Sequence, residues 1–129
     1  MISPVQRKRL LAAARAVRLR AHAPYSRFRV GAAVVDERGR IHVGCNVENA
    51  SYGLTVCAER NAVAAAVAAG AKRIRAVAVV TRDGSSPCGA CRQVLAELGA
   101  ATTEVLLATP AGNPVDHTLG ALLPIAFTF

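Results

Sequence analysis

Two short segments of this chain contain the residue types with the clearest chemistry. Cys57 and Glu59 stand in the first segment, and Cys88 and Cys91 stand in the second, directly after Pro87. Three thiolates that converge on one zinc ion leave the fourth corner of its tetrahedral coordination free for water, which is typical of a catalytic zinc site. Zinc lets bound water ionise near neutral pH. A carboxylate beside the metal can then move protons, so these segments predict a hydrolytic Zn²⁺ centre with Glu59 as the proton carrier.

The spacing of these residues is more specific than a lone Cys-x-x-Cys pair, which is common in redox and structural zinc proteins. Here Cys-x-Glu at 57–59 precedes Pro-Cys-x-x-Cys at 87–91. The same order of residues marks the zinc-dependent nucleobase deaminases. At its two cysteine segments the chain therefore resembles that superfamily.

A fourth cysteine, Cys45, leaves an alternative open. As a fourth thiolate ligand it would close the zinc coordination and give a structural site with no room for water. The basic N-terminal segment could then belong to a module that binds nucleic acid. A structural Cys₄ site has no use for Glu59, however, and a buried cysteine commonly packs as a small apolar side chain. We therefore favour the catalytic interpretation.

Both cysteine segments are expected to begin helices. The pattern that starts at Cys57 runs to about Ala69, and the pattern that starts at Cys88 ends at Gly99. Helix N-termini carry partial positive charge and free N–H groups, which stabilise thiolates. Arg60 and Arg92 follow the two segments, and we expect them to hydrogen-bond the sulfurs and draw off further negative charge. A surface ion pair is the alternative for each arginine.

The other patterns along the chain predict a sheet between helices. A helix begins at Ser3-Pro4, carries an apolar stripe as far as Ala21, includes His22 near its end and stops at Pro24. The remaining expected elements are strands at 30–35, 40–47, 72–81 and 104–109, a turn at 111–114 and a short helical piece at 118–123. This order predicts a mixed sheet sandwiched between helices. With 129 residues, the chain is expected to form one domain, 1–129.

Polar residues cluster where the second of these strands ends. Asn46 and Glu48 are two residues apart, so alternation along an extended strand places both side chains on the same face. Ordinary polarity at a strand end is one interpretation. The functional interpretation is a pair of hydrogen-bonding groups for a vicinal diol or a similar polar ligand.

Several longer segments narrow the resemblance to one group within the superfamily. The segments at 23–33, 44–52, 57–60 and 86–93, together with Leu122-Leu123-Pro124 and Phe127, are similar to the small homotetrameric cytidine deaminases. This resemblance covers nearly the whole chain. It implies a three-layer α/β/α sandwich with a mixed sheet of about five strands. It also implies hydrolysis of cytidine and deoxycytidine to the uridine nucleosides and ammonia, in pyrimidine salvage.

The same resemblance implies roles for individual residues. Zinc would be held by Cys57, Cys88 and Cys91, and Glu59 would protonate N3 of the base and then the departing amine. The residues implied to bind substrate are Asn46 and Glu48 at the ribose hydroxyls, Phe28 at the base, the backbone around Ala58 and Ser86, and Tyr52 and Phe127 from a neighbouring subunit.

Two departures from the usual pattern of these enzymes leave the substrate open. The loop before Pro87 is about two residues shorter than the resemblance leads one to expect, and Ala121 and Ile125 replace a glutamate and a glycine. A deaminase of a modified cytidine, or of a cytosine-nucleoside antibiotic such as blasticidin S, is the alternative. Asn46, Glu48 and Arg60 favour the ordinary nucleoside.

Charge and composition bear on partners and location. Residues 1–35 hold eight basic residues and no acidic one, whereas the other basic and acidic residues balance, so the net charge of +8 belongs to one segment. Aromatic residues, which nucleic-acid surfaces often use, make up only 4%. We expect a solvated helix face there rather than a nucleic-acid site.

No apolar run approaches the ~20 residues of a membrane span, and cysteines assigned to metal favour a reducing, cytoplasmic location. The alanine-rich composition favours self-association.

Overall fold

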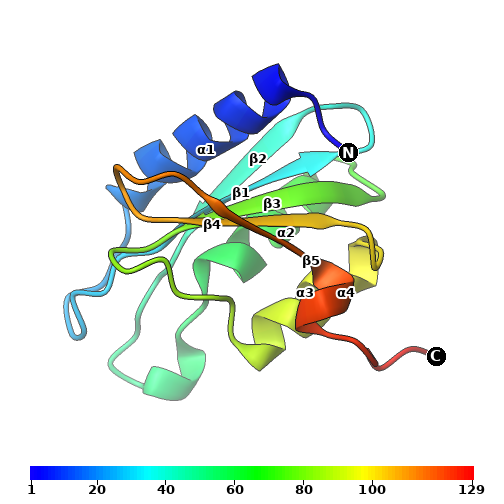
Figure 1. The fold of residues 1–129 in the computed structure, drawn as a ribbon. Helices are drawn as coiled ribbons and strands as arrows, with labels where there is room; N and C mark the ends of the chain where they lie inside the picture. Colours follow the sequence, from blue (N-terminus) through cyan, green and yellow to red (C-terminus); the bar gives the residue numbers. More distant parts are fainter.

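A mixed sheet of five strands forms the centre of the molecule (Figure 1). The computed structural model describes residues 1–129. The strands are β1 (Gly31–Asp36), β2 (Ile41–Cys45), β3 (Ile74–Val80), β4 (Glu104–Ala108) and β5 (Val115–Thr118), in the spatial order β2-β1-β3-β4-β5. Only β3 and β4 run parallel, and the other neighbours are antiparallel. The predicted mixed sheet is confirmed.

Helices cover both faces of this sheet, which gives the expected three layers (Figure 1). They are α1 (Pro4–Arg18), α2 (Ala58–Ala68), α3 (Gly89–Leu98) and α4 (Leu119–Leu122), with a short 3₁₀ helix η1 (Tyr52–Leu54). Ala33 and Val35 of β1 pack under α1, whereas Ala32 and Val34 pack under α2 and α3. Because both faces of the central strands are covered, the middle residues of those strands are apolar. None of the helices is long and apolar enough to cross a bilayer.

The first helix is shorter than the sequence pattern predicts. Ser3 caps it by accepting a hydrogen bond from Gln6 N at 3.1 Å, but the helix ends at Arg18 rather than at Pro24. His22 lies beyond the helix, where its backbone N–H bonds Asn46 O at 3.0 Å and its carbonyl accepts from Glu48 N at 2.8 Å. These bonds compete with a further helical turn, so the predicted position of His22 at a helix end is wrong.

The fifth strand was missed by the sequence patterns. Residues 115–118 pair antiparallel with β4 and form an exposed edge, where a turn was expected to lead directly into a helical piece. Its sequence, Val-Asp-His-Thr, has no buried alternation because neither face is fully covered. An ion pair of 2.6 Å between Arg7 and Asp116 ties this edge strand to α1.

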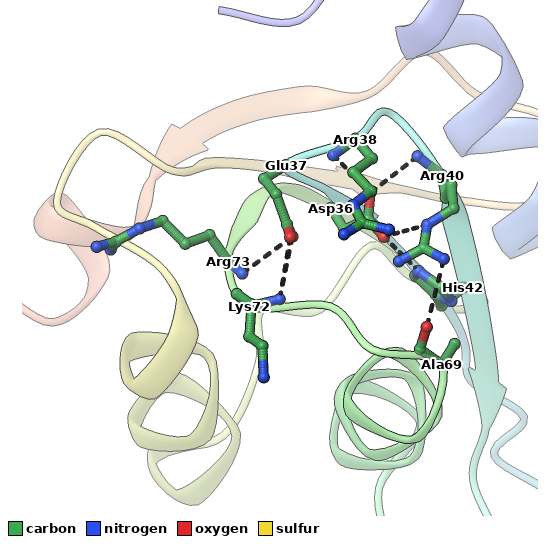
Figure 2. A network of polar contacts seen from close by, with 8 residues as sticks. All are labelled: Asp36, Glu37, Arg38, Arg40, His42, Ala69, Lys72 and Arg73. Carbon is green, nitrogen blue, oxygen red and sulfur yellow. Dashed lines mark hydrogen bonds and ion pairs between the residues drawn. The ribbon is translucent and has the colours of Figure 1, made fainter.

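The turn between β1 and β2 contains a buried polar network (Figure 2). Asp36 is fully buried, and its carboxylate accepts from Arg38 N at 2.9 Å, Arg40 N at 3.0 Å and Arg40 Nε at 2.9 Å. His42 Nε2 lies 2.8 Å from the second carboxylate oxygen. Burial acts to raise the pKa of Asp36, but the hydrogen bonds from His42 and from the Arg40 and Arg38 amides outweigh it and hold that pKa well below its usual range.

The same turn reaches the segment that joins α2 to β3 (Figure 2). Arg40 Nη1 donates to Ala69 O at 3.3 Å, and the carboxylate of Glu37 accepts from Lys72 N at 3.0 Å and Arg73 N at 3.2 Å. The C-terminal end of α2 is thereby fixed to the sheet. This matters for function because the opposite end of α2 carries Cys57 and Glu59.

Candidate metal centre and active site

Three sulfur atoms meet where α2 and α3 begin. Cys57 is the N-cap residue of α2, Cys88 is the N-cap residue of α3, and Cys91 lies in the first turn of α3, as predicted from the sequence. Their sulfurs all lie within 4.8 Å of one another, and those of Cys88 and Cys91 are 3.5 Å apart. Thiolates bound to one tetrahedral zinc at about 2.3 Å stand about 3.8 Å from each other. The cluster therefore fits a zinc ion in both donor type and spacing.

Cys45 is not part of this cluster, so the arrangement of a closed four-cysteine site is absent. It ends β2 and is partly buried, and its carbonyl accepts a hydrogen bond from Asn61 Nδ2 of α2 at 2.9 Å. The three remaining cysteines leave one position of a tetrahedral ion free.

The pKa values of Cys57 and Cys91 are shifted in opposite directions. Hydrogen bonding from Cys91, assisted by Cys88 and by the positive charge of Arg60, lowers the pKa of Cys57 despite the opposing effect of burial. The same hydrogen bond and burial raise the pKa of Cys91. Arg60 thus lies close enough to the cluster to favour a thiolate at Cys57.

Arg92 does not bond a sulfur, which corrects the role expected from its position in the sequence. Its guanidinium donates to Pro87 O at 2.8 Å, Leu122 O at 2.7 Å and Ser86 Oγ at 2.8 Å. The planar guanidinium suits three acceptors spread around its rim. Arg92 therefore holds the loop before Cys88 rather than the metal ligands themselves.

A cavity of about 230 Å³ opens directly beside the cysteine cluster. The predicted site residues that line it are Phe28, Asn46, Glu48, Cys57, Ala58, Glu59, Ser86, Cys88 and Cys91. Sequence reasoning missed six further lining residues, namely Ser26, Val30, Thr55, Val79, Thr81 and Ser85. Val30 and Val79 lie in apolar runs, where no pattern separates a core residue from a cavity wall.

Glu59 lines this cavity and is itself buried. Only 5% of the residue is exposed, since it sits in the first turn of α2 beneath the sheet. Burial raises the pKa of its carboxyl group, and the negative charge at Cys57 adds to that effect. A carboxyl group in this position can both accept and donate a proton near the metal cluster.

Asn46 and Glu48 line the same cavity, as alternation predicted, although β2 already ends at Cys45. Between them, the exposed Val47 forms isolated bridges to His22 and Val56, which continue the extended backbone beyond the strand. Both polar side chains are nearly buried, at 8% exposure. They share this cavity with Glu59 and the three clustered cysteines.

Phe28 forms another wall of the cavity, and its ring is covered by a cation. The guanidinium carbon of Arg82 lies 5.2 Å from the ring centroid. An arginine in this position is attracted to the ring face.

Tyr52 and Phe127 lie outside the cavity of their own chain. They are 64% and 70% exposed. The Tyr52 ring packs edge-to-face on Tyr25 with centroids 6.0 Å apart, and the Phe127 backbone exchanges two hydrogen bonds with the Gln93 amide, at 2.9 and 3.3 Å. Their expected contribution to a neighbouring subunit's site stays a prediction.

Comparison with known protein families agrees with this site. A family model for the cytidine and deoxycytidylate deaminase zinc-binding region matches residues 4–107, a stretch that includes Glu59 and all three clustered cysteines. The chain belongs to this deaminase family. The matched zinc-binding region contains the three cysteines whose spacing fits a zinc ion. The cofactor is therefore zinc.

Individual members of the deaminase family match most of the chain. A cytidine deaminase of Halalkalibacterium halodurans is 48% identical over 126 residues, which cover 96% of each chain. A cytidine deaminase of Mycobacterium tuberculosis is 50% identical over 109 residues, which cover 83% of this chain and 78% of that one. The crystal structure of cytidine deaminase from Burkholderia pseudomallei superimposes with a TM-score of 0.88 at 51% identity and covers 93% of this chain and 98% of that chain.

Proposed function

We propose that this chain is a zinc-dependent cytidine deaminase, which hydrolyses cytidine and deoxycytidine to uridine and deoxyuridine with release of ammonia. One observation carries the proposal: the three-sulfur cluster and the buried Glu59 share a cavity with Asn46 and Glu48. A metal cluster with a carboxylate suits hydrolysis, and the two polar side chains suit a sugar. Relatives named cytidine deaminase at 48% and 50% identity support the same substrate.

Cys57, Cys88 and Cys91 would hold the zinc ion, with Arg60 beside them. When bound, zinc would lower the pKa of a water molecule, so that this water can lose a proton at neutral pH and act as the nucleophile toward C4 of the base. The task of Glu59 is to move protons. Its carboxylate accepts a proton from the water and passes it to N3 of the base, then carries the second proton to the N4 amine. The C4–O bond forms and the C4–N4 bond breaks. The first proton stays on N3, and the second leaves with the amine as ammonia.

The remaining lining residues would bind and orient the nucleoside. Asn46 and Glu48 provide an amide and a carboxylate for the ribose hydroxyls, and Phe28 provides an aromatic wall for the base. Backbone groups around Ala58 and Ser86 would orient the pyrimidine edge. Main-chain donors and acceptors at these positions fit because both residues face the cavity beside the cysteine cluster.

The functional unit that we propose is a homotetramer of single-domain chains, residues 1–129, in the cytoplasm, with a role in pyrimidine salvage. Exposed apolar side chains support self-association: Tyr52, Leu54, Ile125, Phe127 and Phe129 are all more than half exposed. Tyr52 and Phe127 would complete a neighbour's cavity. Sedimentation should give a mass four times the 13.4 kDa of the chain, whereas a monomer that is fully active would contradict this part.

The decisive experiment compares wild type with Glu59→Ala in a cytidine assay followed by ultraviolet absorbance, with zinc measured in the same samples. Wild type should convert cytidine, and Glu59→Ala should keep its zinc but lose about 10³-fold in kcat. Glu97→Ala, an exposed glutamate on α3, is the matched control and should behave as wild type. A wild-type protein that binds zinc and leaves cytidine unchanged would overturn the substrate, and blasticidin S and modified cytidines would be assayed next.

A further inference from the structure

The segment 25–30 covers one side of the cavity and is held there by the two residues proposed to bind the sugar. Asn46 Oδ1 accepts from Val30 N at 2.8 Å, and Asn46 Nδ2 donates to Phe28 O at 2.8 Å. Glu48 Oε1 accepts from Tyr25 N at 3.0 Å and from Ser26 N at 3.2 Å. The proposed sugar contacts and the proposed base contact are therefore physically connected.

Ser26 stands at the centre of this connection. Its hydroxyl donates to Glu48 Oε2 and accepts from Phe28 N, the latter at 3.0 Å. The direction of both bonds is fixed, because an ionised carboxylate can only accept and a backbone N–H can only donate. One hydroxyl thus links the carboxylate of Glu48 to the backbone of the residue whose ring lines the cavity.

The backbone between these two residues is unusual. Arg27 is the only non-glycine residue of the chain with a positive φ, at 58°. A left-handed conformation costs a residue with a side chain about 1–2 kcal/mol, so the surrounding contacts must stabilise it. The hydroxyl of Ser26 closes this turn by bonding Phe28 N across Arg27. The turn aims Ser26 and Phe28 into the same cavity.

The bonding of Glu48 leaves room for a ligand on one oxygen only. Oε1 already accepts two backbone N–H groups, whereas Oε2 accepts only the Ser26 hydroxyl. Each carboxylate oxygen offers about two acceptor positions. One position on Oε2 is therefore open, and the hydroxyl of Ser26 determines where it points.

We propose that Ser26 is a positioning residue for nucleoside specificity: it orients the open acceptor of Glu48 toward a sugar hydroxyl and fixes that carboxylate relative to Phe28. The inference rests on the proposed function, because it assigns a nucleoside to this cavity. Ser26 does not touch the reacting atoms, so its effect should appear in substrate binding and in recognition of the sugar rather than in the chemical step. The hydrogen bond from Ser26 also lowers the pKa of Glu48 against the opposing effect of burial.

The test compares cytidine with 2′,3′-dideoxycytidine, which lacks the 2′ and 3′ hydroxyls of the sugar and keeps the 5′ hydroxyl. Loss of a hydrogen bond to a charged group corresponds to about tenfold or more. Ser26→Ala should therefore raise the KM for cytidine about tenfold and leave kcat within about twofold. The preference for cytidine over the dideoxy compound should fall by a similar factor. Ser26→Thr keeps a hydroxyl and should retain most of that preference. Thr102→Ala removes an exposed hydroxyl outside the cavity and should change neither value.

A double-mutant cycle with Glu48→Gln tests whether Ser26 acts through Glu48. In the Glu48→Gln background, Ser26→Ala should change the dideoxy preference by less than about twofold, because coupled residues do not add. Equal effects of Ser26→Ala in both backgrounds would overturn the inference. So would an unchanged preference in Ser26→Ala while wild type is active. A wild type inactive on cytidine would instead overturn the proposed function, which is a distinguishable result. Circular dichroism and zinc content confirm that each variant is folded.

Discussion

Arg92 of α3 donates a hydrogen bond to Ser86 Oγ over 2.8 Å and so joins the helix that carries Cys91 to the loop that leads into Cys88. The same guanidinium bonds Leu122 O of α4 at 2.7 Å. A residue next to a metal ligand in the sequence thus acts on the loop and on α4. These bonds anchor the loop before Cys88 to α3 and α4.

Arg92→Lys should disturb that loop without removing the metal. A lysine keeps the charge but cannot reach three acceptors from one planar group. We expect kcat/KM for cytidine to fall about tenfold through misplacement of the cavity wall, with zinc content unchanged. Arg75→Lys, at an exposed position of β3, is the matched control. If Arg92→Lys instead loses its zinc, the arginine supports the cysteine ligands after all.

Measurements of zinc binding should distinguish Cys45 from the three clustered cysteines. Cys45→Ser should bind one zinc per chain as wild type does, because Cys45 lies outside the cluster. Cys91→Ser should weaken zinc binding by more than the about 10–100-fold that changes outside the ligand sphere cause. Zinc per chain, measured by atomic emission, and activity after chelation and zinc addition check both expectations. Loss of zinc in Cys45→Ser would instead make it a ligand.

The sequence predicted the cysteine cluster well because metal chemistry restricts the residue types and spacings. Cys57, Cys88 and Cys91 could be assigned to helix starts, and the structure places them there. Long-range hydrogen bonds had no such signal. Arg92 directly follows its motif, as Arg60 does, yet its partners include a carbonyl 30 residues away. Such partners are set by tertiary packing, which local pattern does not encode.

The difference between local patterns and tertiary contacts also explains the errors in the predicted helices and strands. α1 ends early because His22 pairs with residues 46–48, a contact that no local pattern contains. The strand at 115–118 escaped prediction because an exposed edge lacks alternating burial. Ser26 was passed over for a related reason: a single serine in a loop acquires its role only when Glu48 and Phe28 are brought beside it.

Gly44→Ala should displace α2 and, with it, the proposed metal ligand Cys57 at the start of that helix. A Cβ at Gly44 would lie 2.3 Å from Ala62 N and 2.6 Å from Ala58 O, both backbone atoms of α2. Since backbone cannot rotate away, the helix must shift, at a cost of about 1–3 kcal/mol for overpacking. Urea unfolding should report that loss, and zinc affinity should fall with it. Gly53→Ala, where a Cβ meets nothing within 4 Å, should change neither.

Asp36→Asn should destabilise the protein although it lies far along the sheet from the cysteines. The buried carboxylate loses its charge-assisted bonds to Arg40 and His42, which we expect to cost about 2 kcal/mol in the free energy of unfolding at neutral pH. Glu37→Gln, an exposed carboxylate in the same turn, is the control and should lose less. Urea unfolding followed by circular dichroism measures both.

The pH dependence of that difference tests its electrostatic origin. Hydrogen bonds hold the pKa of Asp36 well below its usual range in the folded state, whereas the unfolded chain titrates near the usual value of about 3.9. A depressed folded-state pKa contributes stability that is fully present above the unfolded pKa and is lost as the pH falls below it. The gap between wild type and Asp36→Asn should therefore be constant from about pH 5 to 8 and shrink below about pH 4. A gap that stays constant down to about pH 3 would mean that Asn fails for reasons of packing, not charge.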